Sequence, residues 1–404
     1  MSKIKQLPNG WRKERLDHLA IIQTGIAKNQ NRQGEVIMLP YLRVANVQDG
    51  YLDLTEIKTI DVSKDKTERY MLQIGDVLLT EGGDFDKLGR GAVWEGQIKN
   101  CVHQNHVFVV RIDKEKILPS FLSAQTGVFY GKQYFLSCSK QSTNLASINS
   151  SQLKDFPVLF PPLPEQKAIA DLLSTWDEAI EKTERLIQVK EKRVNGLVYD
   201  LIYHPVKEGR WIQLQAKWLF KERCESRRGD LPLLSITGSD GVIPREETNR
   251  KDTSNDDKSK YLRICPGDIG YNTMRMWQGV SALSKLEGIV SPAYTICIPG
   301  EKLYPPFVAY LFKMPFMIYR FYRYSQGLTS DTWNLKFHHF GEVRIPLPSF
   351  KEQQRIAEII SEVEQEIVLL KQLSEKYKTQ KRGLMQKMLT GAWRIKPDVV
   401  MRYE

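Results

Sequence analysis

The sequence lacks the features of secreted, disulfide-bonded and membrane-spanning proteins. Only five cysteines occur in 404 residues, and their odd number and scattered positions fit neither a disulfide framework nor a zinc site. No apolar run approaches the roughly 18 residues that a membrane helix needs, and the opening text, MSKIKQLPNGWRKERL, has no apolar core of a secretory signal. We therefore expect a folded cytoplasmic protein with two or three domains.

Complete catalytic motifs are also missing. Residues 304–307 (YPPF) resemble the motif with which adenine methyltransferases hold an exocyclic amine, but Tyr304 is a poor acceptor and no glycine-rich cofactor loop precedes it. Residues 127–133 are one position short of a phosphate loop, and residues 256–258 lie in a polar run that predicts a solvated loop. His103 and His106 have no further metal ligands nearby in the sequence. We predict no catalytic residue, no metal site and no cofactor bound to this chain.

What the sequence does contain is an internal repeat with a period of 187 residues. The text PLPEQKAIADLLSTWDEAI, from Pro162, aligns without a gap with SFKEQQRIAEIISEVEQEI, from Ser349. Each copy follows a proline-rich entry and carries apolar residues at alternating spacings of four and three for five heptads. That pattern predicts two helices of a coiled coil, each roughly 55 Å long. The expected helix–helix seam comprises Ile169, Leu173, Trp176, Ile180 and Ile187 with Ile356, Ile360, Val363, Ile367 and Leu370.

Two larger segments, which precede the two helices, resemble each other weakly. LPYLRVANVQDG, from Leu39, parallels LPLLSITGSDG, from Leu231, and both segments mix strand-like with helix-like runs. Glycine and tryptophan recur together near residues 10, 209 and 391, so the order of parts reads cyclically. We predict an α+β fold: two α/β domains separated by two long antiparallel helices that form a coiled-coil spacer, in a pseudo-twofold cyclic repeat with its termini close together. The expected boundaries are 1–155, 156–205, 206–343 and 344–404.

The net charge of +11 is concentrated in the two domain segments. Residues 1–164 hold 21 basic and 17 acidic residues, and residues 204–349 hold 21 and 15. The helical segments 165–203 and 350–388 together hold 14 of each and are neutral. This distribution fits domains that contact a polyanion and helices that contact each other or other proteins.

The arrangement of parts carries a family resemblance. The stretches PVLFPPLPEQKAIADLL, from Pro157, and SQGLTSDTWNLKFHHFGEVRIPLPSFKEQQRIAEII, from Ser325, are similar to the specificity subunits of type I restriction–modification systems. The resemblance covers essentially the whole chain, although the second copy departs from the usual PPLxEQ text at residues 348–353.

The resemblance implies a function. Each variable domain would be a target-recognition domain that reads one half of a split, asymmetric sequence in double-stranded DNA. The helices would set the spacing and dock two methyltransferase subunits. Those subunits would use S-adenosylmethionine, and separate motor-nuclease (restriction) subunits would use ATP and Mg. This chain would therefore be a non-catalytic reader with no membrane association.

Polar or basic loops occupy matching places in the two domain segments. One pair is 81–90 and 272–278, and the other is 139–144 and 323–327. Arginine and lysine suit phosphates or guanine, glutamine and asparagine suit adenine, and glycine permits close approach of the backbone. The candidate DNA-binding residues are Gly82, Gly83, Lys87, Arg90, Lys140, Gln141, Asn144, Asn272, Arg275, Arg323, Gln326 and Gly327.

Two alternatives stay open at this point. A stand-alone DNA methyltransferase or nuclease would need the cofactor and metal motifs that the sequence lacks. A coiled-coil interaction protein without a DNA role would share the helices but would not bind duplex DNA in a salt-dependent way.

Overall fold

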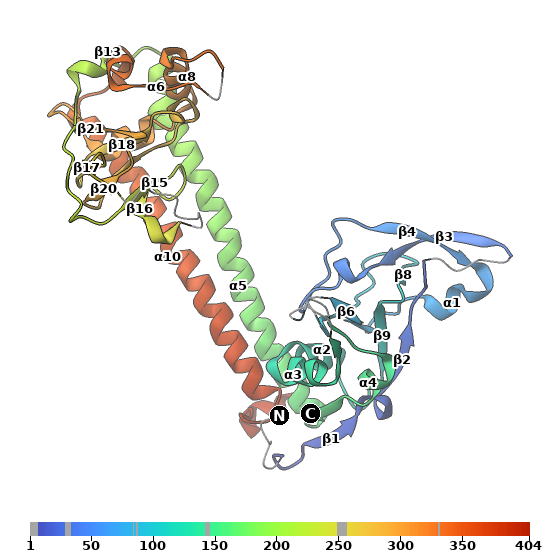
Figure 1. The fold of residues 1–404 in the computed structure, drawn as a ribbon. Coiled ribbons are helices and arrows are strands. Elements are labelled where there is room, and N and C mark those ends of the chain that lie inside the picture. Colours follow the sequence, from blue (N-terminus) through green and yellow to red (C-terminus); the bar gives the residue numbers. More distant parts are fainter. Residues whose placement is uncertain are drawn as a thin grey trace. The chain divides into compact units, whose positions relative to one another are not determined.

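A computed structural model of the chain describes residues 7–28, 34–83, 85, 88–141, 146–248, 257–329 and 332–404. The chain forms two compact units, each of which combines a mixed helix-and-strand domain with part of both long helices (Figure 1). The first unit comprises Met1–Glu184 and Gln372–Glu404, and the second comprises Arg185–Lys371. The predicted α+β class with two long helices is confirmed.

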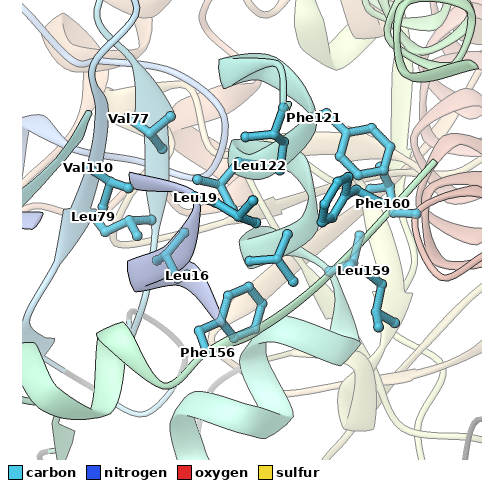
Figure 2. Packing of buried hydrophobic residues seen from close by; sticks show 14 of the residues in the cluster. Leu16, Leu19, Val77, Leu79, Val110, Phe121, Leu122, Phe156, Leu159 and Phe160 are labelled. Carbon is cyan, nitrogen blue, oxygen red and sulfur yellow. The ribbon is translucent and has the colours of Figure 1, made fainter. Parts of the chain in front are cut away.

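The first unit is built around a four-stranded antiparallel sheet with the strand order β2-β9-β5-β7. The strands span Ala20–Thr24, Val107–Ile112, Val77–Thr80 and Gly91–Val93. Strand β5 (VLLT) is buried at every position, which its branched apolar side chains favour. Against β5 and β7 packs helix α2 (Pro119–Gly127), followed by α3 (Phe129–Cys138). In the resulting core, Leu79 and Val110 of the sheet lie near Leu122 of α2 (Figure 2).

Smaller elements complete the first unit. A second sheet has the order β4-β3-β8, with strands at Lys58–Ser63, Val36–Leu42 and Val102–His103. A third has the order β10-β11-β6, with strands at Lys140–Gln141, Ala146–Ser147 and Gly82–Gly83. Two short helices, α1 and α4, span Thr67–Tyr70 and Ser150–Lys154.

The second unit repeats the plan of the first. Its four-stranded antiparallel sheet has the order β14-β21-β18-β19, with strands at Phe220–Glu222, Tyr294–Pro299, Ile269–Asn272 and Ser281–Leu283. Two strand pairs lie beside it: β15 with β16 (Leu234–Ile236, Val242–Pro244) and β17 with β20 (Leu262–Ile264, Gly288–Val290). Helices α7, α8 and α9 span Pro305–Leu311, Pro315–Tyr324 and Phe337–Phe340. The core is rich in aromatic rings, with Phe312, Phe321 and Phe340 fully buried and in mutual contact.

Each unit also has a two-stranded antiparallel ribbon that leads into a long helix. In the first unit β1 (Arg12–Arg15) pairs with β12 (Pro157–Phe160), and in the second β13 (Ile212–Gln215) pairs with β22 (Arg344–Leu347). Residues 157–160 therefore form a strand within the segment 156–205 that the sequence assigned to the spacer. The strand ends at the proline-rich stretch that follows Phe160, because proline has no backbone N–H with which to continue the pairing.

The two long helices follow these ribbons. Helix α5 spans Leu163–Val198 and continues through a π-helical turn at Tyr199–Tyr203 into α6 (His204–Lys207), and α10 spans Phe350–Met388. Within the first unit Glu184 pairs with Lys378 and Asp177 pairs with Lys381, so the two helices run antiparallel there. The predicted antiparallel helix pair is confirmed.

Within the first unit, the C-terminal tail lies beside the first described residues, as the cyclic order of parts predicted (Figure 1). After α10 the chain passes through Trp393 to α11 (Pro397–Val400). The Arg394 guanidinium donates to both carboxylate oxygens of Glu165, at 3.0 and 2.6 Å, and to the backbone oxygen of Asn9 at 3.0 Å. The tail after the second helix therefore contacts both the start of the chain and the start of the first helix.

Candidate nucleic-acid interface

In the first unit, the structure brings the two predicted loop segments together. Gly82 and Gly83 form β6, which pairs with Ala146 and Ser147 of β11, and β11 in turn pairs with β10 at Lys140. The Ile148 N–H donates to the Glu81 backbone oxygen at 2.9 Å. Segments 81–90 and 139–144 thus share one small sheet, although the sequence indicated loops for both.

The second unit joins its two segments in the same way. The Leu335 N–H donates to the Thr273 backbone oxygen at 2.8 Å, and this bond occupies the repeat-equivalent place of the Ile148 bond. Aromatic rings also pack between the two segments. Trp277 contacts Trp333 with ring centroids 5.2 Å apart, and Trp333 contacts Tyr322 at 4.9 Å. The turn at 272–278 and the segment after α8 therefore form one surface.

One glycine in each candidate surface lies too close to a neighbouring backbone to be replaced by another residue. A Cβ on Gly82 would stand 2.8 Å from the Ala146 backbone oxygen. Gly327, with φ of 149°, would place a Cβ 2.7 Å from the backbone of Thr332. Gly82 therefore lies at the contact between the two segments of the first unit, whereas Gly327 lies at a close backbone contact within the segment after α8.

A buried carboxylate anchors the turn before the strand that leads to each surface. The Asp76 carboxylate accepts two hydrogen bonds of 2.8 Å from Arg111 and one of 2.8 Å from the Gln73 N–H. The Asp268 carboxylate accepts from Arg223 at 2.7 and 3.0 Å and from the Cys265 N–H at 2.8 Å. These bonds raise the pKa of both arginines. The bidentate pairing fixes the geometry of the turn in each domain.

The candidate cations differ in how freely they can reach DNA. The side chains of Arg275, Arg323 and Lys140 are exposed, and Arg323 makes only a 3.5 Å contact to the Tyr319 hydroxyl among the described hydrogen bonds. Arg90, in contrast, is largely buried and donates to the Gln48 amide oxygen at 2.9 Å. Arg90 therefore holds its own domain together, which the sequence did not reveal because Gln48 lies 42 residues away.

Two candidate amides are partly engaged by the chain itself. The Asn272 Oδ1 accepts from the Met274 N–H at 3.0 Å, which caps the turn, and its Nδ2 has no partner among the described residues. The Gln326 Nε2 donates to the Tyr324 backbone oxygen at 3.3 Å. Lys87 and Asn144 lie outside the described residues, and Gln141 is placed only by its backbone in β10.

A polar cavity of about 380 Å³ adjoins the candidate turn in the second unit. Asn272, Arg275 and Gln278 line one side, and the turn between β15 and β16 lines the other. Lys313 ties the two sides together, because its amine donates to the backbone oxygens of Gly279 at 2.9 Å and Gly238 at 3.2 Å. Burial lowers the pKa of this amine. Gln278 was not among the predicted residues, although it ends the predicted segment 272–278.

The predicted seam residues lie partly in the helix pair and partly in the domain cores. Ile169 and Leu173 belong to the core of the first unit, as do Ile356 and Ile360 to that of the second. Ile187, Val363 and Ile367 form a separate cluster against which Leu370 packs. Trp176 meets Tyr377 edge to face at 5.8 Å, and Ile180 is half-buried.

A repeated glutamine fastens each helix to its domain. The Gln166 amide oxygen accepts from the Leu118 N–H at 2.9 Å, and its amide N–H groups donate to the backbone oxygens of Lys116 and Pro161 at 2.9 and 2.8 Å. Gln353 makes the same three bonds, with Tyr304, Lys302 and Pro348, at 2.9, 2.9 and 3.2 Å. The glutamine that follows each proline-rich stretch is therefore the buried link between a domain and its long helix.

The described residues hold neither a metal-binding cluster nor a membrane-spanning helix. The ranges from 7 to 404 that the structure describes contain no group of three or more histidine, cysteine or carboxylate side chains able to hold a metal ion. In the same ranges, no helix is both long enough and apolar enough to cross a bilayer.

Comparison with known proteins gives a consistent result. Residues 8–191 and 215–378 each match the family described as the type I restriction modification DNA specificity domain. A provisionally named type I restriction enzyme MjaX specificity subunit from Methanocaldococcus jannaschii is 26% identical, over 98% of this chain and 96% of the relative.

Solved structures show the same fold. The HsdS subunit from Thermoanaerobacter tengcongensis is 16% identical with a TM-score of 0.55, and the match covers 97% of this chain and 99% of that one. The S subunit of the M. genitalium type-I restriction-modification system is 16% identical with a TM-score of 0.53, over 96% and 98% of the two chains.

Proposed function

Because the chain belongs to the type I restriction modification DNA specificity domain family, we propose that it reads a split, asymmetric sequence in double-stranded DNA. The domains of residues 1–155 and 206–343 each read one half. The observation that carries the proposal is the repeated joint: Ile148 to Glu81 and Leu335 to Thr273. The same backbone framework thus presents different side chains in the two domains, which is what an asymmetric target requires.

The helical segments 156–205 and 344–404 set the spacing of the half-sites and dock two methyltransferase subunits in this proposal. A fixed number of helical residues fixes a distance, and the loss of one turn shortens a helix by about 5.4 Å. Docking is supported by three apolar side chains on the helices in the second unit, Leu186, Val189 and Leu369, which are 43%, 57% and 64% exposed. Leu186 and Val189 lie one turn apart on α5, and neighbouring exposed apolar side chains favour a protein partner.

Specificity subunits of this family are not catalytic. We assign adenine methylation with S-adenosylmethionine to the methyltransferase subunits, and ATP- and Mg-dependent translocation and cleavage to restriction subunits.

Mapping of adenine methylation in cells with and without this chain tests the proposal. The expected result is a two-part motif that disappears with the chain. Arg275→Ala should relax the motif in one half only, and Lys140→Ala, the matched variant in the first domain, should affect only the other half. Methylation by the purified chain alone, or an unchanged motif without the chain, would favour a stand-alone enzyme or a protein with no DNA role.

A further inference from the structure

The facing edges of the two long helices carry charges of opposite sign. In the first unit the Lys378 amine lies 2.9 Å from a Glu184 carboxylate oxygen. In the second unit the Lys371 amine lies 2.7 Å from a Glu191 carboxylate oxygen. Both acids belong to α5 and both bases to α10, and each pair of like charges is seven residues apart. The acidic edge is defined here as Glu184 and Glu191, and the basic edge as Lys371 and Lys378.

These four residues occupy only two positions of the repeat. With the period of 187, Glu184 corresponds to Lys371 and Glu191 corresponds to Lys378. The backbone framework is therefore the same on both helices, whereas the charge is inverted. A second copy of α5 in the place of α10 would set Glu191 where Lys378 stands and Glu184 where Lys371 stands. Both attractions would become repulsions between carboxylates.

Other contacts between the helices would also be lost in such a pairing. Asp177 now pairs with Lys381 and Lys190 with Glu366, the latter at 2.5 Å. Under the same replacement, Lys381 becomes Val194, and Glu366 becomes Ala179. Asp177 and Lys190 would then each face an uncharged side chain.

We propose that the acidic edge of α5 and the basic edge of α10 form a pairing code, which selects α5 with α10 and rejects the α5 of a second copy of this chain. The repeat itself creates the need, because two domain-plus-helix halves of similar backbone could otherwise associate as identical pairs. An identical pair would join two equal domains, whereas pairing of α5 with α10 joins the two different ones. The proposal does not depend on the DNA target, since none of the four residues lies in a recognition domain.

The test uses three full-length chains that all keep two opposite-charge pairs between α5 and α10. The wild type is the first. The second, Glu184→Lys/Glu191→Lys/Lys371→Glu/Lys378→Glu, inverts both edges, so that each edge still repels a copy of itself. The third, Glu191→Lys/Lys371→Glu, gives each edge one charge of each sign, so that a copy of α5 or α10 now attracts itself.

Sedimentation equilibrium at low salt then measures dimers of the 46.8 kDa chain. Four repulsive contacts become attractive in a dimer of the third chain, so its dissociation constant should be at least about tenfold lower than those of the other two. The difference should shrink at high salt. Equal dimer content in all three chains, including none in any, would overturn the proposal. A thermal melt and near-ultraviolet circular dichroism check that all three chains fold alike.

Discussion

The two recognition domains hold the same buried carboxylate with arginines from different strands. Asp76 is bound by Arg111, which lies on β9, whereas Asp268 is bound by Arg223, which directly follows β14. In both cases the carboxylate is almost inaccessible, with exposed fractions of 1% and 3%. The two domains therefore share the position of the buried carboxylate but not the position of the arginine that pairs with it. Sequence divergence between the domains is tolerated where the geometry of the bonds survives.

Removal of either arginine should cause the largest loss of stability. Comparison of the two losses tests whether the two ion pairs stabilise their domains equally. Arg111→Met and Arg223→Met each leave a buried carboxylate without its cation, which costs about 3–5 kcal/mol. Hydrogen exchange should show the loss in β5 and β9 for the first variant and in β18 for the second. The lysine variants keep a charge and should cost less. A loss below 1 kcal/mol in one domain only would show that its carboxylate finds another partner.

Gln166 and Gln353 should contribute equally to the stability of their units, because they make the same hydrogen bonds in both. Gln166→Leu and Gln353→Leu each leave two backbone oxygens and one N–H without partners, at a cost of about 1–3 kcal/mol. The two costs, measured by denaturant unfolding, should agree closely. Unequal costs would mean that one helix is fastened to its domain by other contacts.

The sequence predicted the features that depend on local periodicity. The heptad spacing of Trp176, Ile187 and Val363 indicated the helix pair, and the repeat indicated which loops correspond. Local sequence patterns could not show that Arg90 packs against Gln48, which is 42 residues away. Nor could they show that β6 pairs with β11, because Gly83 and Ala146 are 63 residues apart. The arginine partners of Asp76 and Asp268 escaped prediction for the same reason.

The long helices show the same limit of prediction from sequence. Ile169 and Ile356 fit the heptad pattern as well as Ile187 does, yet they lie in the domain cores rather than in the separate helix cluster. Periodicity identifies the buried stripe of a helix and does not tell which partner covers each turn of it.

The pH dependence of stability should also differ between the two domains. Burial lowers the pKa of His103 in the first unit to about 4, and its Nδ1 lies 2.7 Å from the Val107 backbone oxygen. The unfolded chain takes up the proton near pH 6.5 and the folded chain does not, so stability is lost as the pH falls from 6.5 towards 4. The expected loss at pH 5.5 is about 1 kcal/mol.

Hydrogen exchange should show most of this loss in the first unit, because His103 is almost inaccessible, whereas His339 of the second unit, whose pKa is also lowered by desolvation, is only half-buried. His103→Gln is the control and should remove the added pH dependence. An equal loss in both units would trace the effect to other groups.

The smallest expected effect compares one arginine from each surface. Arg275 is exposed with no partner for its guanidinium among the described residues, whereas Arg90 is buried against Gln48. If Arg275 contacts a phosphate, Arg275→Ala lowers the salt slope of the logarithm of the duplex-DNA binding constant by about 1. Arg90→Ala should leave that slope unchanged and act on the stability of the first domain instead. Equal changes in slope would mean that Arg90 leaves Gln48 when DNA binds, and the two domains would then offer their cations to DNA by different routes.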